Sequence, residues 1–313
     1  MTFAFIFPGQ GSQSVGMGKD LAEAFPAARR VFEEVDDALD QKLSDMMFNG
    51  PMEDLTLTTN TQPALMACSM AAIAVLSEEF GIKPEDQAFL AGHSLGEYSA
   101  LCAAGSISLA DTAKLLRIRG DAMQAAVPVD AGAMAALLGA SVDQAEAAAE
   151  AGAKHGICQI ANDNATGQIV LSGEKDAVQA AVDACSDLGI KKAMMLNVSA
   201  PFHCDMMMPA AAKMREALAH QSILVPSVPV VNNVTARPVT EPDQIREDLI
   251  TQVTGRVRWR ESIEWMAANG VESFAEPGTG KVLTVMLKRI VSGVEGTALN
   301  SPESIEAFAQ KMK

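Results

Sequence analysis

The sequence predicts an α/β protein, in which a large domain with a mostly parallel sheet carries an inserted ferredoxin-like subdomain. Strand-like apolar segments alternate with helical segments along most of the 313 residues, which is typical of a parallel sheet covered by helices. Residues 129–198 instead follow the order strand, helix, strand, strand, helix, strand. We therefore expect a large domain from residues 1–128 and 199–313 and a subdomain from residues 129–198.

The first part of the chain supplies two predicted strands. Residues 2–7 are apolar and end at the turn Pro8-Gly9-Gln10-Gly11, and residues 88–91 form a second apolar run before Gly92. Both runs have the length of a buried strand. Apolar residues at helical spacing predict helices over residues 20–39, 62–80, 97–104 and 109–126, the first of them interrupted at Pro26.

The rest of the chain alternates in the same way around the expected subdomain. Within the subdomain, turn-forming residues at 162–167 separate the two central strands. Its expected elements are strands at 133–138, 157–161, 168–171 and 190–198, and helices at 141–153 and 174–188. After it we expect helices at 205–220, 242–253, 258–269 and 281–291, and strands near 228–232 and 271–275.

Composition narrows the class of protein. Hydrophobic residues make up 49% of the chain, enough for a large core, and the net charge of −15 leaves no basic stripe for a nucleic acid. The five cysteines show no C-x-x-C pair, which indicates a reduced, cytosolic compartment. The N-terminus lacks the features of a signal peptide, and we expect no segment of membrane-spanning length. We therefore expect a cytoplasmic protein with no metal site and no membrane or nucleic-acid partner.

The stretch FLAGHSLGEYSA, residues 89–100, places Ser94 between two glycines. One interpretation is a tight strand-to-helix turn with Ser94 as a helix cap. The other is a nucleophile elbow, in which the serine lies on a strained turn at the end of a strand and exposes its hydroxyl. A predicted strand before it and a helix after it favour the elbow, and with it a hydrolase-like large domain.

A serine nucleophile needs a base, and the sequence offers four histidines. His93 adjoins Ser94, so its side chain should diverge from that of the serine. His203 follows a strand and opens a helix, where α/β enzymes assemble their sites, and it is the favoured base. The adjacent Cys204 is the weaker candidate nucleophile. No acid stands out to complete a triad, so a main-chain carbonyl or a side-chain amide is expected to orient the histidine.

Two glycine-rich turns fail as cofactor motifs. Gly9 and Gly11 would need a third glycine where Ser14 stands, and Gly278-Thr279-Gly280-Lys281 lacks the remainder of a phosphate-binding loop. Neither NAD nor ATP is therefore expected, and we expect no cofactor.

Four segments together resemble one family. They are FPGQGSQ (7–13), GHSLGEYSA (92–100), the Arg-Gly pair within LLRIRGDAMQ (115–124) and VSAPFHC (198–204). In this order, over nearly the whole chain, they resemble the malonyl-CoA:acyl carrier protein transacylases, the acyltransferases of type II fatty acid synthesis. The resemblance implies that Ser94 accepts the malonyl group and that His203 is the general base and acid. It also implies that the N–H groups of Gln10 and Leu95 form an oxyanion hole and that a carbonyl of Gln252 orients His203.

The resemblance also implies how substrates are recognised. Arg119 would grip the malonyl carboxylate, and Phe202 resembles the malonyl-selecting form of its position. Malonyl-CoA would be a substrate and not a cofactor. The partner would be a small acidic acyl carrier protein, and we expect this chain to act as a monomer. Because this chain is itself acidic, docking would need a basic patch. The candidates are Lys191, Lys192, Lys288 and Arg289, with Arg256, Arg258 and Arg260 as a weaker third group.

Three alternatives stay open. A serine esterase or thioesterase would release the acyl group to water, but a cation such as Arg119 beside the acyl chain suits a substrate that ends in a carboxylate. A non-catalytic carrier-binding module would not need both Ser94 and His203. An acyltransferase of polyketide synthesis would carry the same residues.

Overall fold

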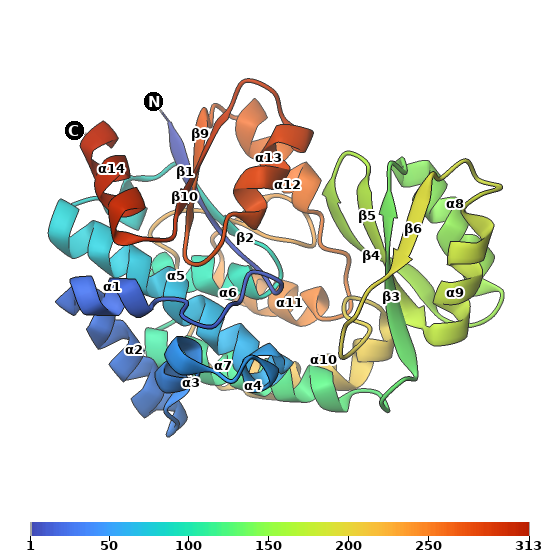
Figure 1. Cartoon of the computed structure of the whole chain (residues 1–313), viewed down its shortest axis with the longest axis horizontal. Coiled ribbons are helices and arrows are strands. Elements are labelled where there is room, and N and C mark those ends of the chain that lie inside the picture. The colour runs from blue at the N-terminus through green and yellow to red at the C-terminus, as the bar shows by residue number, and fades with distance from the viewer. Residues whose placement is uncertain (1, 313) are drawn as a thin grey trace.

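The computed structural model describes residues 2–312, which form two sheets in two side-by-side bodies (Figure 1). The larger sheet has the strand order β10-β9-β1-β2-β7-β8. All of its neighbouring strands pair in parallel except β7 and β8, so the predicted mostly parallel sheet is confirmed. Its strands are β1 (Phe3–Phe7), β2 (Phe89–Gly92), β7 (Val230–Val231), β8 (Pro238–Val239), β9 (Ser273–Pro277) and β10 (Glu295–Leu299).

Strand β1 shows why this sheet is central. All five of its residues are buried, and alternate side chains enter different cores. Phe3, Phe5 and Phe7 join the large core with the helices of one face, whereas Ala4 and Ile6 pack on the other face with residues of α12 (Trp259–Ala268) and α13 (Val282–Ile290). The sheet is therefore buried on both faces, as a parallel sheet must be.

The helices of the large domain follow the prediction closely, with additions. The predicted break at Pro26 separates α1 from α2, whereas α3, α4, the short strand β8 and the C-terminal β10 and α14 were not predicted. Between the helices lie two 3₁₀ turns, η1 (Pro84–Asp86) and η2 (Asp205–Met207), the second replacing the predicted start of α10. The helices are α1 (Lys19–Ala24), α2 (Pro26–Leu39), α3 (Leu43–Asn49), α4 (Met52–Thr56), α5 (Thr58–Phe80), α6 (Leu95–Ala103), α7 (Leu109–Ala125), α10 (Met208–Ala219), α11 (Pro242–Gln252), α12, α13 and α14 (Pro302–Met312).

Helix α5 corrects one expectation. Its 23 residues are long and apolar enough to cross a membrane, so the expectation that no segment reaches that length is wrong. Most of the helix is buried inside the protein, where it packs against α2, α6 and α7. It is apolar all round because it is a core helix covered on every side.

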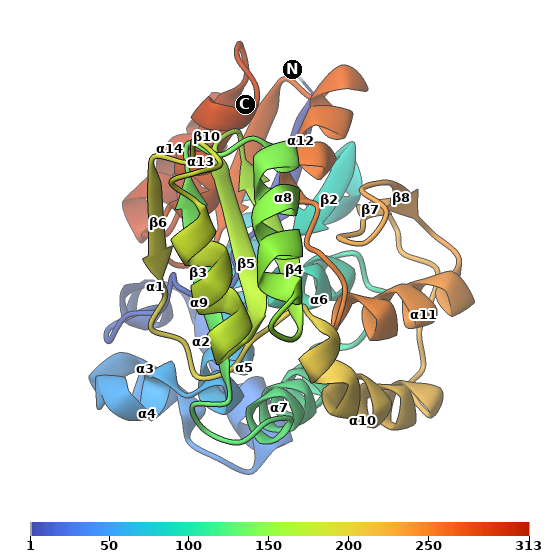
Figure 2. The ribbon, with the colours of Figure 1, turned by 90° about the vertical axis from the view of Figure 1, so that its right-hand side faces the viewer.

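The smaller body is an antiparallel sheet with the order β4-β5-β3-β6, and α8 (Val142–Ala153) and α9 (Lys175–Ala184) cover one of its faces (Figure 2). Its strands are β3 (Gly132–Leu138), β4 (Cys158–Ala165), β5 (Gln168–Glu174) and β6 (Lys192–Met195). All lie within residues 129–198, and their sequence and spatial order are those of a ferredoxin-like unit. Strand β6 is shorter than expected, because residues 196–201 form a loop that leads to His203.

The expected turn at residues 162–167 is wrong for its first part. Asn162, Asp163 and Asn164 belong to β4, and only Thr166 and Gly167 form the turn. The polar side chains of residues 162–164 favour a turn locally, but in the folded protein distant residues satisfy their hydrogen-bonding groups within the strand. The Asp163 carboxylate accepts hydrogen bonds from Arg256 at 2.9 Å and from Arg260 at 2.8 Å.

Strand β4 also fixes the smaller body to the larger one. The N–H of Asp163 donates to the carbonyl of Val257 at 2.9 Å, and the N–H of Val257 donates to Ala161 at 2.8 Å. Arg256 and Arg260 therefore serve a contact between the two bodies, which argues against their proposed part in docking. This contact lies beside the cleft in which the candidate site is found.

Candidate active site

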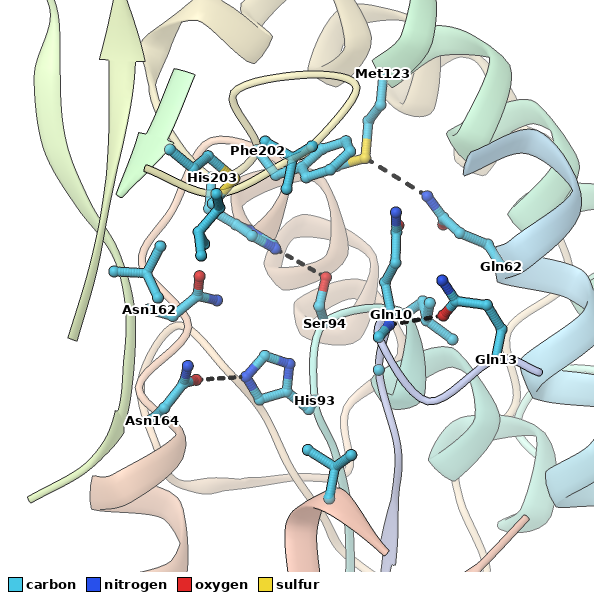
Figure 3. Close-up of a pocket in the computed structure, with 18 of the residues that line it drawn as sticks. Gln10, Gln13, Gln62, His93, Ser94, Met123, Asn162, Asn164, Phe202 and His203 are labelled. Carbon is cyan, nitrogen blue, oxygen red and sulfur yellow. Dashed lines mark hydrogen bonds between the residues drawn. The ribbon is translucent and has the colours of Figure 1, made fainter. Parts of the chain in front are cut away.

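A cavity of about 300 Å³ lies between the two bodies, and it collects most of the residues singled out from the sequence (Figure 3). The large domain contributes its two central strand ends and α7, and the smaller body contributes β3, β4, β5 and the loop after β6. The predicted site residues that line it are Gln10, Ser94, Leu95, Arg119, Phe202 and His203. Gln252 lies behind this lining and is fully buried.

Ser94 occupies a strained turn between β2 and α6. Its φ of 54° and ψ of −110° lie where a residue with a side chain rarely goes. Both flanking positions must be glycine, because there is no room for a side chain. A Cβ on Gly92 would lie 1.8 Å from the carbonyl oxygen of Gly96, and a Cβ on Gly96 would lie 2.2 Å from that of Phe7. The turn therefore has the tight geometry of a nucleophile elbow, with the Ser94 side chain facing the cavity.

The Ser94 hydroxyl meets the imidazole of His203. The distance from Ser94 Oγ to His203 Nε2 is 2.8 Å, and His203 Nδ1 lies 2.9 Å from the main-chain carbonyl oxygen of Gln252. Since a carbonyl only accepts, Nδ1 carries the proton, and Nε2 is free to accept the proton of the serine. Burial, together with the nearby Arg119 cation, lowers the pKa of His203 to about 3. The imidazole is therefore a neutral base at physiological pH.

The two predicted oxyanion donors, Gln10 and Leu95, both belong to the lining of the cavity. Leu95 is the first residue of α6, so its N–H has no acceptor within the helix. The turn after β1 packs directly on the elbow, since a Cβ on Gly9 would lie 2.7 Å from the carbonyl oxygen of His93, and this places the next residue, Gln10, at the cavity. The N–H of Ser94 itself is engaged, since it donates to Asn233 Oδ1 at 2.7 Å. The oxyanion role of Gln10 and Leu95 stays a prediction.

Arg119 is a buried cation beside the serine. It is 1% exposed, and its Nη2 donates to Ser94 Oγ at 3.1 Å and to Gln252 Oε1 at 2.9 Å. Its Nη1 donates to Gln62 Oε1 at 2.7 Å. Within residues 2–312 no carboxylate forms an ion pair with it. Neutral amides, a hydroxyl and the ring of Tyr98, whose centroid lies 5.7 Å from Arg119 Cζ, surround this buried guanidinium, so it is suited to receive an anion.

The other candidates for chemistry are engaged elsewhere. His93 diverges from Ser94 as expected, with Nε2 2.7 Å from Asn164 Oδ1 (Figure 3). Its ring centroid lies 5.6 Å from that of Trp259. Cys204 donates its thiol to the carbonyl of Pro201 at 3.2 Å, and burial raises its pKa. A buried, protonated thiol is a poor nucleophile. Within residues 2–312 no cluster of side chains has the composition of a metal site.

Several residues that support the site were not predicted from the sequence. Gln62 at the start of α5, Asn164 on β4 and Asn233 after β7 each bond a residue of the site. An amide carries no motif of its own, so only the fold shows these contacts. Phe202 lines the cavity with apolar residues of the smaller body, and its selecting role stays a prediction.

The four predicted docking residues are exposed, and two of them, Lys192 and Arg289, lie near the same end of the smaller sheet. Lys192 pairs with Leu138, which pairs with Gln168 across the next strand. Arg289 of α13 donates to the side chain of Gln168 at 3.4 Å. Neighbouring strands lie about 4.8 Å apart, so about two strand spacings separate Lys192 from Gln168, the residue that Arg289 contacts. The exposed surface that carries Lys191, Lys192, Lys288 and Arg289 is called the basic edge. Their docking role stays a prediction.

Comparisons with known proteins agree with this geometry. The chain matches the acyl transferase domain family over residues 4–299. It is 45% identical to the malonyl CoA-acyl carrier protein transacylase of Bacillus subtilis (strain 168) over 99% of this chain and 97% of that protein. It is also 45% identical to the transacylase of the same name from Escherichia coli (strain K12), over 97% of this chain and 98% of that protein.

Solved structures are also similar over nearly the whole chain. The acyl-carrier-protein S-malonyltransferase of Bartonella henselae shares 56% identity with a TM-score of 0.97, over 100% of this chain and 99% of that one. A malonyl-transacylase solved in complex with a type II polyketide acyl carrier protein shares 41% identity with a TM-score of 0.96, over 99% of this chain and 100% of that one.

Proposed function

Because the chain belongs to the acyl transferase domain family, we propose that it transfers the malonyl group of malonyl-CoA to the phosphopantetheine thiol of acyl carrier protein, as a step of fatty acid synthesis. The protein is an acyltransferase. One observation carries the choice of acyl group: the Arg119 guanidinium is buried without a carboxylate partner among the described residues, and its Nη2 lies 3.1 Å from Ser94 Oγ. A three-carbon acyl group that ends in a carboxylate would supply the missing anion.

The first half-reaction acylates Ser94. His203 Nε2 accepts the proton of the hydroxyl as Oγ attacks the thioester carbon. The tetrahedral oxyanion accepts hydrogen bonds from the N–H groups of Gln10 and Leu95, and one such donor is worth about 3–4 kcal/mol. The C–S bond then breaks, His203 returns its proton to the departing thiolate, and CoA leaves a malonyl ester on Ser94.

The second half-reaction reverses these steps with a different thiol. The phosphopantetheine thiol enters the cavity, and neutral His203 removes its proton as the sulfur attacks the ester carbon. The Ser94–acyl bond breaks, and Ser94 recovers its proton from His203. The reaction exchanges one thioester for another, so it is reversible. Each proton has a donor and an acceptor among these residues, and the proposed reaction uses no cofactor.

The alternatives differ in the fate of the acyl-enzyme. An esterase or thioesterase would pass the acyl group to water, and a binding module would form no acyl-enzyme. A quenched-flow measurement with malonyl-CoA separates them. We expect a burst of malonyl-enzyme whose decay is much faster with acyl carrier protein than with water. Decay at the same rate in both would favour hydrolysis, and the absence of a burst would favour a binding module.

Arg119→Ala is expected to change selectivity more than chemistry. A hydrogen bond between charged groups contributes about 1.5–3 kcal/mol, so kcat/KM for malonyl-CoA should fall at least tenfold. Acetyl-CoA has no terminal carboxylate that could bind Arg119, so it loses no such contact. Removing the buried cation also makes the pocket less polar for the acetyl group. Steady-state kinetics with both thioesters tests this. Equal losses for both would mean that Arg119 only supports the structure.

Docking of the carrier protein is proposed for the basic edge described above. Residues of α13, among them Val282 and Met286, line the active cavity, while Lys288 and Arg289 lie exposed in its last turn. The same helix therefore joins the basic edge to the cavity mouth. An acidic carrier protein bound there would have a short path for its phosphopantetheine arm.

Reversing the charge of Lys288 and Arg289 to glutamate should raise KM for the carrier protein and leave KM for malonyl-CoA nearly unchanged. The effect should shrink as salt rises, because ions screen both the native attraction and the new repulsion. Lys213 and Arg215 of α10, changed to glutamate, alter the net charge equally at another exposed place and form the control. An unaltered carrier-protein KM at low salt would remove α13 from the docking surface.

We also propose that the enzyme is a cytoplasmic monomer that acts without a membrane or nucleic acid. The net charge of −15 supports this, because a net charge far from zero keeps a protein soluble and monomeric and repels an acidic nucleic acid. Light scattering across a range of concentrations tests the monomer.

A further inference from the structure

The strained backbone of Ser94 is held at both ends by buried side chains. Its N–H donates to Asn233 Oδ1 at 2.7 Å, and its carbonyl oxygen accepts from Gln252 Nε2 at 3.0 Å. A residue with a side chain in this region of φ and ψ costs on the order of 1–3 kcal/mol. Hydrogen bonds of this kind must offset that free-energy cost if the Ser94 hydroxyl is to stay within hydrogen-bond distance of His203.

A single carboxylate oxygen accepts hydrogen bonds from both of these residues, Asn233 and Gln252. Glu97 Oε2 accepts from the main-chain N–H of Asn233 at 2.9 Å and from Gln252 Nε2 at 2.8 Å. Glu97 lies in the first turn of α6, is 2% exposed and is not part of the cavity lining. No step of the proposed reaction uses it.

The amide of Gln252 is oriented by the same contact. Its nitrogen lies between two acceptors, Glu97 and the Ser94 carbonyl, which turns its oxygen toward Arg119 at 2.9 Å. The main-chain carbonyl of Gln252 also holds His203. The nucleophile, the base and the substrate-binding cation therefore all depend on where this residue lies.

We propose that Glu97 is a positioning residue, whose acceptor oxygen holds Asn233 and Gln252 and through them keeps Ser94 in its reactive conformation. What matters in this arrangement is how far the acceptor oxygen extends from the backbone of α6, and the charge of the Glu97 carboxyl group does not matter. Burial raises the pKa of Glu97 to about 7, and a proton on the other carboxyl oxygen leaves Oε2 an acceptor. The part that concerns Arg119 rests on the proposed function, whereas the part that concerns Ser94 does not.

Two substitutions separate reach from charge. Glu97→Asp keeps the carboxylate but withdraws it by about 1.5 Å, the length of one C–C bond. Glu97→Gln keeps an oxygen at the same reach without the charge. The reactivity of Ser94 is measured as the second-order rate of labelling by a small fluorophosphonate, which needs the nucleophile and base but no malonyl recognition. We expect Glu97→Asp to label at least tenfold more slowly than the wild type, and Glu97→Gln to stay within threefold.

Glu276→Asp is the matched control. Glu276 is 1% exposed and accepts the main-chain N–H groups of Leu283 and Thr284 at 3.0 and 2.7 Å, away from Ser94. The Glu276→Asp variant should have a lower melting temperature than the wild type and an unchanged labelling rate. A Glu97→Asp rate within threefold of the wild type would overturn the proposal. So would a tenfold loss in Glu97→Gln, which decides the matter even where Glu97→Asp does not fold.

The same assays separate this inference from the proposed function. If the wild type labels rapidly but transfers no malonyl group, the proposed function fails and the labelling comparison still decides the role of Glu97. If malonyl transfer is normal and Glu97→Asp labels normally, only the inference fails. Where both hold, kcat/KM for malonyl-CoA should fall in Glu97→Asp in parallel with the labelling rate.

Discussion

Ser94→Ala is expected to abolish the malonyl-enzyme and to lower malonyl transfer by about 10⁴-fold or more, as the loss of an activated nucleophile does in other serine enzymes. The hydroxyl is the group that faces His203 Nε2 at 2.8 Å, and alanine leaves nothing for that base to deprotonate. Malonyl-CoA should still bind, because Arg119 and the rest of the cavity lining are unchanged. Intact-protein mass spectrometry after treatment with malonyl-CoA measures the adduct directly.

Cys204→Ala provides the control for this experiment. Cys204 is the other nucleophile near the site, but its thiol is buried, donates to Pro201 and has a raised pKa. The variant should keep both the adduct and the transfer rate. A malonyl adduct that persists in Ser94→Ala and disappears in Cys204→Ala would move the nucleophile to the cysteine.

The sequence predicts the local parts of this site well. An elbow is a short pattern in which each residue has a local reason, and the structure provides that reason in the close approach of Gly92 and Gly96 to carbonyl oxygens. His203 could be selected among the histidines because it follows a strand and opens a helical segment. The parallel sheet could likewise be predicted, because buried strands such as residues 3–7 are apolar on both faces.

The polar network behind the site could not be predicted, because its contacts join distant parts of the chain. Asn162, Asp163 and Asn164 have the local chemistry of a turn, yet arginines after α11 and the ring of His93 hold two of them in a strand. Glu97 has the local pattern of an ordinary acidic residue at a helix start. Only the fold buries it and brings Asn233 and Gln252 to one of its oxygens.

One omission had a signal in the sequence. Helix α14 places Ile305, Phe308 and Ala309 on one buried face, and this spacing is the usual mark of an amphipathic helix. Strand β10 is different, since most of its residues are partly or fully exposed and only Leu299 is buried. An edge strand of this kind has no apolar alternation from which it could be predicted.

His203→Ala is expected to lower malonyl transfer by about as much as the loss of Ser94, because a nucleophile and its base act as one unit. In the wild type, burial and the Arg119 cation lower the pKa of His203 to about 3. The lowered pKa keeps the imidazole neutral as the pH falls through 6.5, the usual pKa of histidine. The wild-type kcat/KM for malonyl-CoA should therefore show no loss between pH 7 and pH 5 that a histidine of ordinary pKa would cause.

The variant should have a different pH profile. Without a base beside it, Ser94 must lose its proton to hydroxide, so the residual rate should rise about tenfold per pH unit above neutrality. The adduct should still form slowly on Ser94, which separates loss of the base from loss of the nucleophile. Rates of malonyl-enzyme formation from pH 5 to pH 9 in both proteins test these expectations. Full activity of His203→Ala at neutral pH would transfer the role of base to another group, with His93 as the first candidate despite its bond to Asn164.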